Sequence, residues 1–393
     1  MLPYYLFYNT QRRIIMRFVM VSKHYPVEGD PIFVFSQQIA EAMAGYHNVE
    51  TLVISPQSIT RKLIHHKKIT KSVYRTELRN GNTVTVYAFP YFTFSETNNK
   101  LLQKIQKASN SRALKKCIKK AGINQRDYCY SMFWEMGKQF DEALSEMNIS
   151  TNLIVESSES VLQNGTEISN YDFKNLKAIV CVSSEKVNEC TKYNLIKKAP
   201  HSLIPNGFDA NVFKKLDRMA MRKKLGLPED KFIIAFVGSF IERKGIPELN
   251  DVLKETEDVY SIFIGSGHLN IDCPNVLFKG SLDHDNIPEY LNAADVFVLP
   301  TKHEGCANVI VEALGCGLPI ISSRKDFNKE VLNDNCAILI DPDSREELKA
   351  AIEKLRDNKE LRQSMEQASY EMGQTLTIEK RTKRILDLIE SLN

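Results

Sequence analysis

Two carboxylates stand eight positions apart in a segment whose residue types suit a polar, anionic ligand. Glu304 and Glu312 flank Gly305 and the helix-forming run 308–311. A carboxylate can accept hydrogen bonds from two hydroxyls of a ribose or a hexose, and backbone N–H groups at a helix N-terminus attract a pyrophosphate. We therefore expect the glutamates to hold the two ends of one elongated ligand, whose phosphates would be covered by Gly305, Cys306, Ala307 and Asn308. For an isolated pair of acids, a turn residue and a solvated helix residue would be the commoner interpretation.

A second cluster of candidate residues follows the apolar run 232–237. It begins with Gly238 and Ser239 and contains two adjacent cations, Arg243 and Lys244. The sequence shows no metal motif, so the charge of a leaving diphosphate would have to be neutralised by cationic side chains and helix dipoles. We predict that the two cations supply this charge, although an isolated Arg-Lys pair is usually a solvated turn. A third glycine turn, at 265–267, is a weak indicator by itself.

Short apolar runs alternate with helical patterns along most of the chain, which is typical of parallel sheets with crossover helices. In the first half we predict strands at 14–22, 49–55, 83–89, 153–156 and 178–183, and a helix at 35–43 that Gly45 closes. In the second half we predict strands at 232–237, 260–264, 276–278, 295–299, 319–322 and 337–340. Because ligands of such sheets bind outside the carboxyl ends of the strands, the loop 301–305 lies at the expected binding edge.

The chain divides most naturally near Pro205, where a strand ends in proline and the Asn-Gly turn 206–207. We therefore predict two doubly wound α/β domains. The N-terminal domain comprises residues 16–204 and 375–393, and the C-terminal domain comprises residues 205–374. Met16 directly precedes the first expected strand, so residues 1–15 are interpreted as an N-terminal extension without a structural role. Their apolar run precedes the arginines and no small-residue cleavage site follows, so we expect no signal peptide.

The composition is that of an ordinary globular protein. The chain has 393 residues, of which 43% are hydrophobic and 26% are charged, and this is enough for two buried cores. The eight cysteines are scattered without a Cys-x-x-Cys or a Cys/His cluster. Neither a disulfide framework nor a structural metal is therefore indicated, and a reducing cytoplasm is expected. No apolar run reaches the roughly 18 residues of a membrane span.

Positive charge is concentrated in the first third of the chain. Up to Arg126 there are 20 lysines and arginines against 6 aspartates and glutamates, although the net charge of the whole chain is only +3. The segment 100–120 contains no acid and has apolar residues at near-helical spacing, and a second basic cluster spans 61–71. Such segments can lie on anionic lipid; a solvated helix face that covers the first domain is the alternative. A nucleic-acid partner is disfavoured, because no aromatic residues alternate with these lysines.

In residues 178–356 the sequence resembles the retaining glycosyltransferases of family 4, which have the GT-B fold of two Rossmann-like domains facing across a cleft. The similar motifs occur in family order, at 182–183, 204–209, 236–245, 265–267, 293–300, 304–314, 317–320, 330–331 and 340–342. The first half resembles the family only loosely, through residues 16–22, the helix 35–45 and Gly29. Gly29 follows the first strand and is expected on the substrate side.

The resemblance implies a role for each residue singled out above. Glu304 and Lys244 would be the catalytic residues, the first holding the transferred sugar and the second a phosphate. Glu312 would bind the ribose, and the segment 305–308 would cover the phosphates. Ser239 stands where the family usually has an arginine, which leaves one phosphate contact open, and Arg243 is the candidate to replace it. Many relatives carry a histidine after the strand at 153–156, where this chain has Ser-Ser-Glu. Glu159 is a candidate for the acceptor side, and a surface acid is an equally good interpretation of it.

The resemblance further implies retaining transfer of a hexose from a UDP- or GDP-linked donor to a hydroxyl of a glycan or polyprenyl-linked acceptor. Family members of this type act in the synthesis of bacterial capsule, O-antigen or teichuronic acid. Their leaving phosphate helps to deprotonate the acceptor, so no enzymic nucleophile is expected, and the reaction is expected to be metal-independent and without a cofactor. With the basic first domain, this predicts a protein peripheral on the cytoplasmic face of an anionic membrane. A catalytically silent homologue that binds a partner, and a GT-B nucleotide-sugar epimerase, are the alternatives; the oligomeric state stays open.

Overall fold

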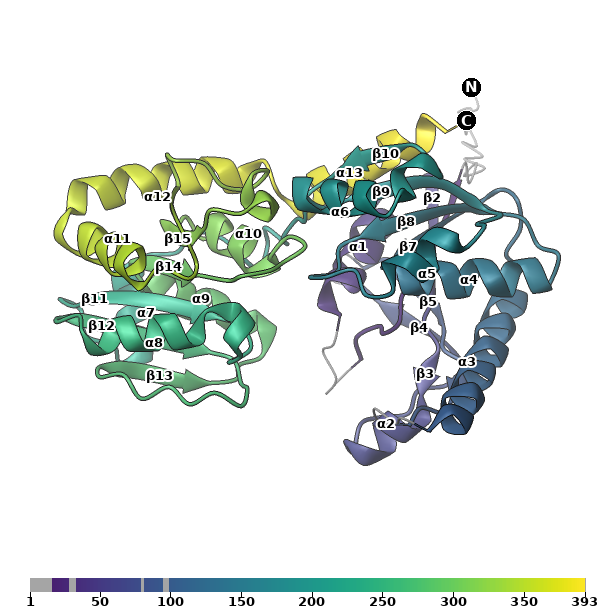
Figure 1. Cartoon of the computed structure of the whole chain (residues 1–393), viewed down its shortest axis with the longest axis horizontal. Coiled ribbons are helices and arrows are strands. Elements are labelled where there is room, and N and C mark those ends of the chain that lie inside the picture. The colour runs from purple at the N-terminus through teal and green to yellow at the C-terminus, as the bar shows by residue number, and fades with distance from the viewer. Residues whose placement is uncertain (1–15, 28–32, 79–80, 95–98, 393) are drawn as a thin grey trace, which may run out of the picture. The chain divides into compact units, whose positions relative to one another are not determined.

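The computed structural model describes residues 16–27, 33–78, 81–94 and 99–392. The predicted extension at 1–15 and the candidate Gly29 lie outside these residues. The described chain contains two large sheets with helices between successive strands, and Figure 1 follows it from purple near the N-terminus to yellow at the C-terminus. The α/β class and the two doubly wound sheets predicted from the sequence are confirmed.

The first sheet has eight strands in the order β10-β9-β8-β7-β1-β2-β5-β4. They are β1 (Met16–Val21), β2 (Val49–Ile54), β4 (Val73–Glu77), β5 (Thr83–Tyr87), β7 (Asp127–Met132), β8 (Asn152–Ser157), β9 (Leu176–Cys181) and β10 (His201–Leu203). The pairs β1–β2, β1–β7, β2–β5 and β9–β10 are parallel, and the edge pair β4–β5 is antiparallel. A separate small sheet joins β3 (Gln57–Ser58) and β6 (Pro90–Tyr91). The helices of this region are α1 (Val34–Ala44), α2 (Ile59–Ile64), α3 (Lys100–Ala121), α4 (Trp134–Glu146), α5 (Gly165–Asn170) and α6 (Ser184–Lys192).

Strand β7 is not predicted from the sequence, although it lies beside β1 in the middle of the sheet. All six of its residues are buried, yet the segment Asp-Tyr-Cys-Tyr-Ser-Met lacks the apolar run typical of a buried parallel strand. Its first residue, Asp127, is fully buried and lies 3.3 Å from Arg17 of β1. Burial raises the pKa of the Asp127 carboxyl, and the Arg17 charge opposes that shift. The same lack of an apolar run explains why β4 is not predicted, whereas β10 lies just before Pro205, where the sequence predicts the end of a strand.

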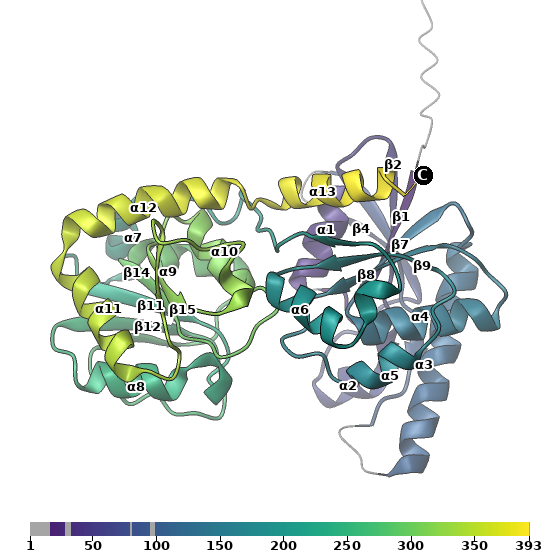
Figure 2. The same cartoon turned by 45° about the horizontal axis from the view of Figure 1, so that its top comes forward.

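The second sheet has six strands in the order β13-β12-β11-β14-β15-β16, and every neighbouring pair is parallel. Its strands are β11 (Phe232–Val237), β12 (Val259–Ile264), β13 (Val276–Gly280), β14 (Val296–Leu299), β15 (Ile320–Ser323) and β16 (Ala337–Ile340). Figure 2 shows helices on both faces of this sheet: α7 (Arg218–Leu225), α8 (Ile246–Lys254), α9 (Ile287–Ala293), α10 (Asn308–Gly315), α11 (Arg345–Asp357) and α12 (Lys359–Gln374). The sequence predicts all six strands. The four inner strands are buried on both faces and are nearly continuous apolar runs, and the edge strands β13 and β16 also contain apolar runs.

The order of the second sheet changes direction between β11 and β14. From β11 the chain continues outward to β12 and β13 on one side, and it then returns to β14, β15 and β16 on the other side. This is the strand order of a Rossmann domain. At such a switch point the connections leave the two strands toward opposite faces, and ligands bind in the crevice outside the carboxyl ends. The turn after β11 and the loop after β14 contain the two candidate clusters, so the topology places both at one edge.

A buried ion pair fixes the start of β14. Asp295, directly before the strand, accepts hydrogen bonds from Arg222 of α7 at 2.7 Å and from the N–H of Ile233 at 2.8 Å. Arg222 is itself buried and also donates hydrogen bonds to three backbone carbonyls. Because a buried charge is stable only with such partners, the pair holds α7, β11 and β14 in one arrangement.

The last helix, α13 (Ile378–Glu390), is attached to strands of the first sheet. Arg381 donates a hydrogen bond at 2.7 Å to Glu156 of β8, and both side chains are buried. Arg384 donates to the carbonyl of Leu203 in β10. By compactness, the described residues divide into one unit that runs to Ile154 and includes 173–176, and a second unit that contains 155–172 and the residues from 177 onward. The domain boundaries expected from the sequence stay a prediction.

We expect Asp295→Ala to lower the free energy of unfolding by about 3–5 kcal/mol, because it leaves the buried Arg222 guanidinium without its anion. Urea denaturation followed by circular dichroism measures this change. The control is Glu289→Ala, which removes a more exposed ion pair with Lys224 and should cost less than about 1 kcal/mol. Equal losses in the two variants would contradict the role given to the buried pair.

Candidate functional site

The loop after β14 is anchored at Lys302, three positions after the strand. The Lys302 N–H donates to the carbonyl of Arg243 at 2.8 Å, and the Lys302 ammonium lies 2.9 Å from Glu248 and 2.6 Å from Asp343. Hydrogen bonds to Asp343 and Glu248 raise the pKa of Lys302 above its ordinary value. The loop is therefore tied to the turn after β11, to α8 and to the segment after β16.

Three donors converge on one carboxylate oxygen in this loop. Oε1 of Glu304 accepts hydrogen bonds from Lys244 and from Arg243, the latter at 3.0 Å. The hydroxyl of Thr301 lies 2.9 Å from the same oxygen. The side chains of Glu304 and Lys244 are only 10% and 13% exposed, and that of Arg243 is 31% exposed. Arg243 also donates to the carbonyl of His303, so the turn and the loop are joined at several points.

This arrangement concentrates positive charge at the carboxyl ends of β11 and β14. The two cations, Arg243 and Lys244, share the single carboxylate of Glu304, so positive charge exceeds negative charge within these three side chains. Charges that are largely removed from water interact more strongly than exposed ones. The cluster is therefore suited to attract a further anionic group, and the oxygens of Glu304 are suited to accept hydrogen bonds from hydroxyls.

The glycines beside this cluster are required by backbone packing. Gly265 has a φ of +144°, and a Cβ there would lie 1.9 Å from the carbonyl oxygen of Gly238. A Cβ at Gly267 would lie 2.2 Å from the carbonyl oxygen of Phe240. The turns after β11 and β12 thus contact each other backbone to backbone, which explains the third glycine turn without a ligand. Ser239, in the same region, is exposed.

Helix α10 begins directly after the loop, as the sequence predicts. Its N-cap residue, Ala307, makes no side-chain cap, so no capping side chain occupies the first N–H groups of the helix. Asn206 donates to the carbonyl of Cys306 at 2.8 Å and to the side-chain oxygen of Asn308 at 2.7 Å. Burial raises the pKa of the Cys306 thiol to about 12, which excludes a thiolate nucleophile near neutral pH at this position.

The second glutamate of the motif is paired with a histidine. Oε1 of Glu312 lies 3.0 Å from Nε2 of His284, and the Glu312 side chain is only 9% exposed. His284 belongs to the turn after β13, and its ring contacts that of Phe213 with centroids 5.0 Å apart. The pair fixes the direction of the Glu312 carboxylate. Sequence spacing gives no signal for His284, because the contact depends on the strand order.

The predicted residues therefore fall into separate groups. Glu304, Lys244 and Arg243 form one cluster, whereas Glu312 is held by a contact of its own. Thr301 and Asn206 contribute hydrogen bonds that are not predicted from the sequence. A signal for Thr301 does exist, because it follows β14 by two positions and so lies at the edge where ligands of parallel sheets bind.

The candidate Glu159 lies in the loop after β8. Its carboxylate accepts a hydrogen bond from the N–H of Ser158 at 3.1 Å. In the same compact unit, a Cβ at Gly305 would lie 2.3 Å from the carbonyl oxygen of Ser158 and 3.2 Å from that of Glu159. The close approach therefore involves the backbone of this loop, and it explains why position 305 is a glycine.

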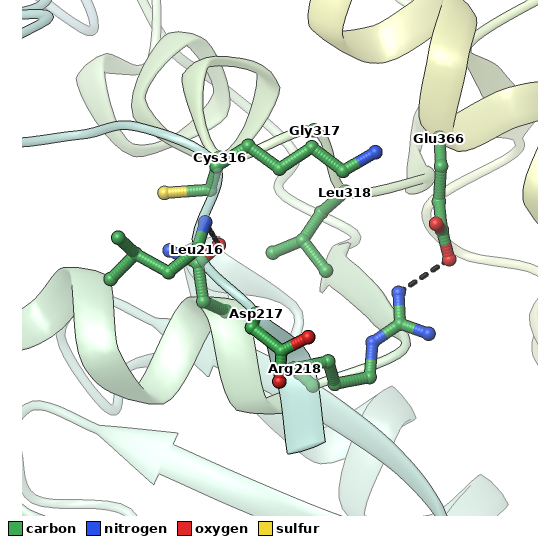
Figure 3. A pocket seen from close by; sticks show the side chains of 10 residues that line it. Leu216, Asp217, Arg218, Cys316, Gly317, Leu318 and Glu366 are labelled. Atoms are coloured by element: carbon green, nitrogen blue, oxygen red, sulfur yellow. Dashed lines mark hydrogen bonds and ion pairs between the residues drawn. The ribbon is translucent and has the colours of Figure 1, made fainter. Parts of the chain in front are cut away.

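A cavity of about 260 Å³ lies apart from these residues (Figure 3). It is lined by Lys215, Leu216, Asp217, Arg218, Asn292, Ala294, Cys316, Gly317, Leu318 and Glu366. None of these is a predicted site residue. Figure 3 shows Arg218 directed toward Glu366. The Arg218 guanidinium also lies 3.3 Å from the carboxylate of Asp295. Since this cation is already paired within the fold, we assign no ligand to the cavity.

Metal-binding clusters and membrane-spanning helices are both absent from the described residues. They contain no group of three or more histidines, cysteines, aspartates or glutamates arranged to hold a metal ion. In the same part of the chain, no helix combines the length and apolar character needed to cross a membrane. All eight cysteines are buried and none is in a disulfide.

The charged cluster falls in a region with known relatives. Residues 217–372 match the glycosyl transferases group 1. This group 1 region includes the whole second sheet and the residues Lys244, Glu304 and Glu312, and it covers less than half of the chain. LpsD of Rhizobium meliloti, a lipopolysaccharide core biosynthesis glycosyltransferase, is 31% identical over 179 residues, which are 43% of this chain and 52% of LpsD. The chain spans about half the length of the curated relatives that it matches.

Two solved structures resemble nearly the whole chain. Sucrose-phosphate synthase from Thermosynechococcus elongatus has a TM-score of 0.75 at 17% identity, covering 96% of this chain and 99% of that one. HepE of Anabaena, in complex with UDP and glucose, has a TM-score of 0.71 at 17% identity, covering 96% of this chain and 100% of that one. At this identity the likeness shows the fold. The GT-B fold with two Rossmann-like domains, expected from the sequence, is confirmed.

We expect Gly265→Ala to lower the free energy of unfolding by about 1–3 kcal/mol, because the added Cβ would clash with the carbonyl of Gly238. The matched control is Gly280→Ala. Gly280 also has a positive φ, +159°, but a Cβ there would meet nothing closer than 3.7 Å. Both variants place alanine in an unusual conformation, so the difference between their urea midpoints reports the backbone contact. A smaller loss in Gly265→Ala than in the control would contradict the packing argument.

Proposed function

We propose that the chain is a retaining glycosyltransferase that moves a hexose from a UDP- or GDP-linked donor to a hydroxyl of a glycan or polyprenyl-linked acceptor. The observation that carries this proposal is the convergence of Lys244, Arg243 and Thr301 on Glu304 at the switch point of the second sheet. The cluster lies in the region that matches the glycosyl transferases group 1. The similarly folded HepE was solved with UDP and glucose, which supports a nucleotide-sugar donor.

In the proposed complex, the diphosphate binds between the two cations and the N-terminus of α10. Lys244 and Arg243 neutralise its charge, and the N–H groups of the first helical turn donate to its oxygens. Glu304 then accepts hydrogen bonds from hydroxyls of the transferred sugar. Glu312, directed by His284, accepts hydrogen bonds from the ribose. Because the exposed Ser239 carries no charge, Arg243 is the second cation of this phosphate site.

The proposed transfer uses no covalent intermediate with the protein. The bond between the anomeric carbon and the phosphate oxygen breaks, and the acceptor oxygen forms its bond on the same face. The acceptor proton passes to the leaving phosphate, which departs as a nucleoside diphosphate. The contribution of the protein is to stabilise the charge that develops on this phosphate. We propose that the reaction is metal-independent, with Lys244 and Arg243 supplying the positive charge.

We propose further that the acceptor belongs to a bacterial surface polysaccharide. The relative LpsD is named for lipopolysaccharide core biosynthesis, which supports this class of acceptor. The excess of positive charge up to Arg126 suits either an acceptor that carries phosphate or the anionic membrane that holds it. In this proposal the protein acts as a peripheral protein at the cytoplasmic face of the cell membrane.

A donor screen tests the proposed activity. The purified chain is incubated with each common UDP- and GDP-sugar, with and without a polyprenyl-linked acceptor, and mass spectrometry measures the released nucleotide and the transferred sugar. Release of UDP or GDP with sugar transfer is the expected result, and proton NMR of the product tests retention of the anomeric configuration. Conversion of the donor sugar to its epimer would indicate an epimerase instead. Nucleotide binding without turnover across the whole panel would indicate a catalytically silent homologue.

We expect Glu304→Gln to lower kcat by roughly 10²–10³-fold. The amide keeps the shape of the side chain but loses the charge that holds the cations and orients the sugar. Nucleotide affinity, measured by calorimetry, should change much less than kcat. The control Glu289→Gln alters a glutamate on α9 outside the cluster and should leave both quantities unchanged. Wild-type turnover by Glu304→Gln would remove Glu304 from the catalytic site.

His284 is expected to act as a positioning residue for Glu312. We predict that His284→Phe raises the Kd for UDP or GDP about 5–10-fold, the equivalent of one lost hydrogen bond, and leaves kcat within about two-fold. His284→Gln retains an N–H donor and should restore most of the affinity. His201→Gln, at an exposed histidine of β10, is the control. Unchanged nucleotide affinity in His284→Phe would show that the contact does not direct the Glu312 carboxylate.

A further inference from the structure

Most of the large apolar side chains that the described residues expose lie in one region of the first unit. Eight such side chains are exposed, and six of them belong to three segments, 59–71, 90–94 and 99–112, which together we call the α2–α3 surface. The six are Leu63, Ile64, Ile69, Phe92, Leu101 and Ile105, with exposed fractions of 45% to 65%. Apolar residues concentrated in this way mark an interaction surface, whereas scattered single ones do not.

Hydrogen bonds hold the three segments together. Thr93 donates its N–H to the hydroxyl of Thr60 at the start of α2, at 2.8 Å. The N–H of Phe92 donates to Ser109 of α3 at 3.0 Å, and that of Phe94 donates to Gln106 at 2.8 Å. The segment that carries Phe92 is thus fixed between α2 and α3. Figures 1 and 2 both show α2 and the first turns of α3 at the same end of this unit.

Helix α3 divides the apolar stripe of the segment 100–120 into two parts. All five buried residues of the helix lie in its second half, between Ala113 and Ala121. This half, which includes Leu114 and Ile118, packs its apolar residues into the first unit. It therefore agrees with the interpretation of the segment as a helix that covers the first domain. Leu101 and Ile105, in the first half, are exposed. The first half is therefore the part of the helix that can face a partner.

Every charged residue of the three segments that form the α2–α3 surface is basic. The segments contain no aspartate or glutamate. Exposed lysines in these segments are Lys68, Lys71, Lys100, Lys104 and Lys107. The apolar side chains are thus interspersed with positive charge. This combination is complementary to a bilayer, whose anionic headgroups attract the lysines and whose acyl region accepts apolar side chains.

We propose that the α2–α3 surface docks on a bilayer that contains anionic lipid, with Leu63, Phe92 and Leu101 entering the boundary of the acyl region. This inference rests on the peripheral membrane association proposed above and identifies the surface that performs it. A nucleic acid would contact the lysines through its phosphates but would leave the six apolar side chains in water. A protein partner would need its own apolar patch bordered by acids, and it is an outcome of the test below.

Vesicle co-sedimentation of the purified full chain tests the docking. Vesicles of phosphatidylcholine alone are compared with vesicles of phosphatidylcholine and phosphatidylglycerol. We expect binding to the mixed vesicles to be at least about ten-fold stronger and to weaken with added salt. Absence of binding to the mixed vesicles would overturn both the surface and the membrane association. Donor hydrolysis, measured on the same sample, reports the proposed transferase activity separately.

The apolar contribution is tested with Leu63→Ser combined with Leu101→Ser. We expect about a ten-fold loss of binding to the mixed vesicles. The matched control combines Val161→Ser with Met219→Ser, at the two other large apolar residues that the described part of the chain exposes, and should bind as the wild type does. Two results would contradict docking through the α2–α3 surface: wild-type binding by the surface variant, or an equal loss of binding in the control. Either result would leave membrane association itself standing. Circular dichroism of each variant confirms that the fold is kept.

The charged contribution has its own pair of variants. Lys104→Gln with Lys107→Gln should reduce binding to the mixed vesicles several-fold, since each cation near an anionic surface contributes separately. Lys223→Gln with Lys224→Gln removes two exposed lysines from α7 and serves as the control. Equal losses in the two pairs would show that binding follows net charge, which contradicts a defined docking surface.

A fluorescent probe distinguishes insertion from another partner. The chain contains a single tryptophan, Trp134, which is fully buried. In Phe92→Trp, the new emission should shift to shorter wavelength on the mixed vesicles and be quenched by brominated phospholipid, whereas the emission of the wild type should not. Absence of quenching, together with a change in oligomeric state in Leu63→Ser, would assign the surface to a second protein chain and overturn the docking proposal.

Discussion

The candidate site depends on one carboxylate, that of Glu304, to which Lys244, Arg243 and Thr301 all extend. Glu304 follows β14, and Lys244 follows β11, 60 positions earlier. The contact exists because these two strands are neighbours in the second sheet. A largely buried acid is costly without positive partners, so the carboxylate and the cations stabilise each other's position. The same proximity leaves an excess of positive charge where the strands end, and an anionic ligand is what this charge attracts.

Close backbone contact is the second constraint on this half of the chain. The turn after β11 meets the turn after β12 at Gly238 and Gly265, and a Cβ at Gly245 would lie 2.2 Å from the carbonyl oxygen of Pro300. At such positions no other residue type fits without moving a strand. The match to the glycosyl transferases group 1 lies in this half, at 217–372. Few residue types fit turns that are fixed by backbone contact or positions in a buried charge cluster. This is a physical reason why related sequences remain similar in this half.

The positive charge of the first third of the chain has two distinct roles. Part of it is structural: Arg17 lies 3.3 Å from the buried Asp127, and Lys115 pairs with Glu146 of α4. The lysines of the α2–α3 surface instead accompany apolar side chains that the fold leaves in water. The net charge of the sequence does not separate these two groups of cations. Whether a given cation is paired depends on which acids the fold brings near it.

By itself, the sequence determined the six strands of the second sheet, the start of α10 and the positions of Lys244, Arg243 and Glu304 beside strand ends. These features are local: a strand buried on both faces is an apolar run, and a ligand edge follows each run. Only the tertiary structure decided that the cations meet Glu304, that His284 directs Glu312, and that the polar segment of β7 is a central strand. The physical reason is that hydrophobic pattern is a property of neighbouring residues, whereas a hydrogen-bond partner is set by the order in which distant strands pack.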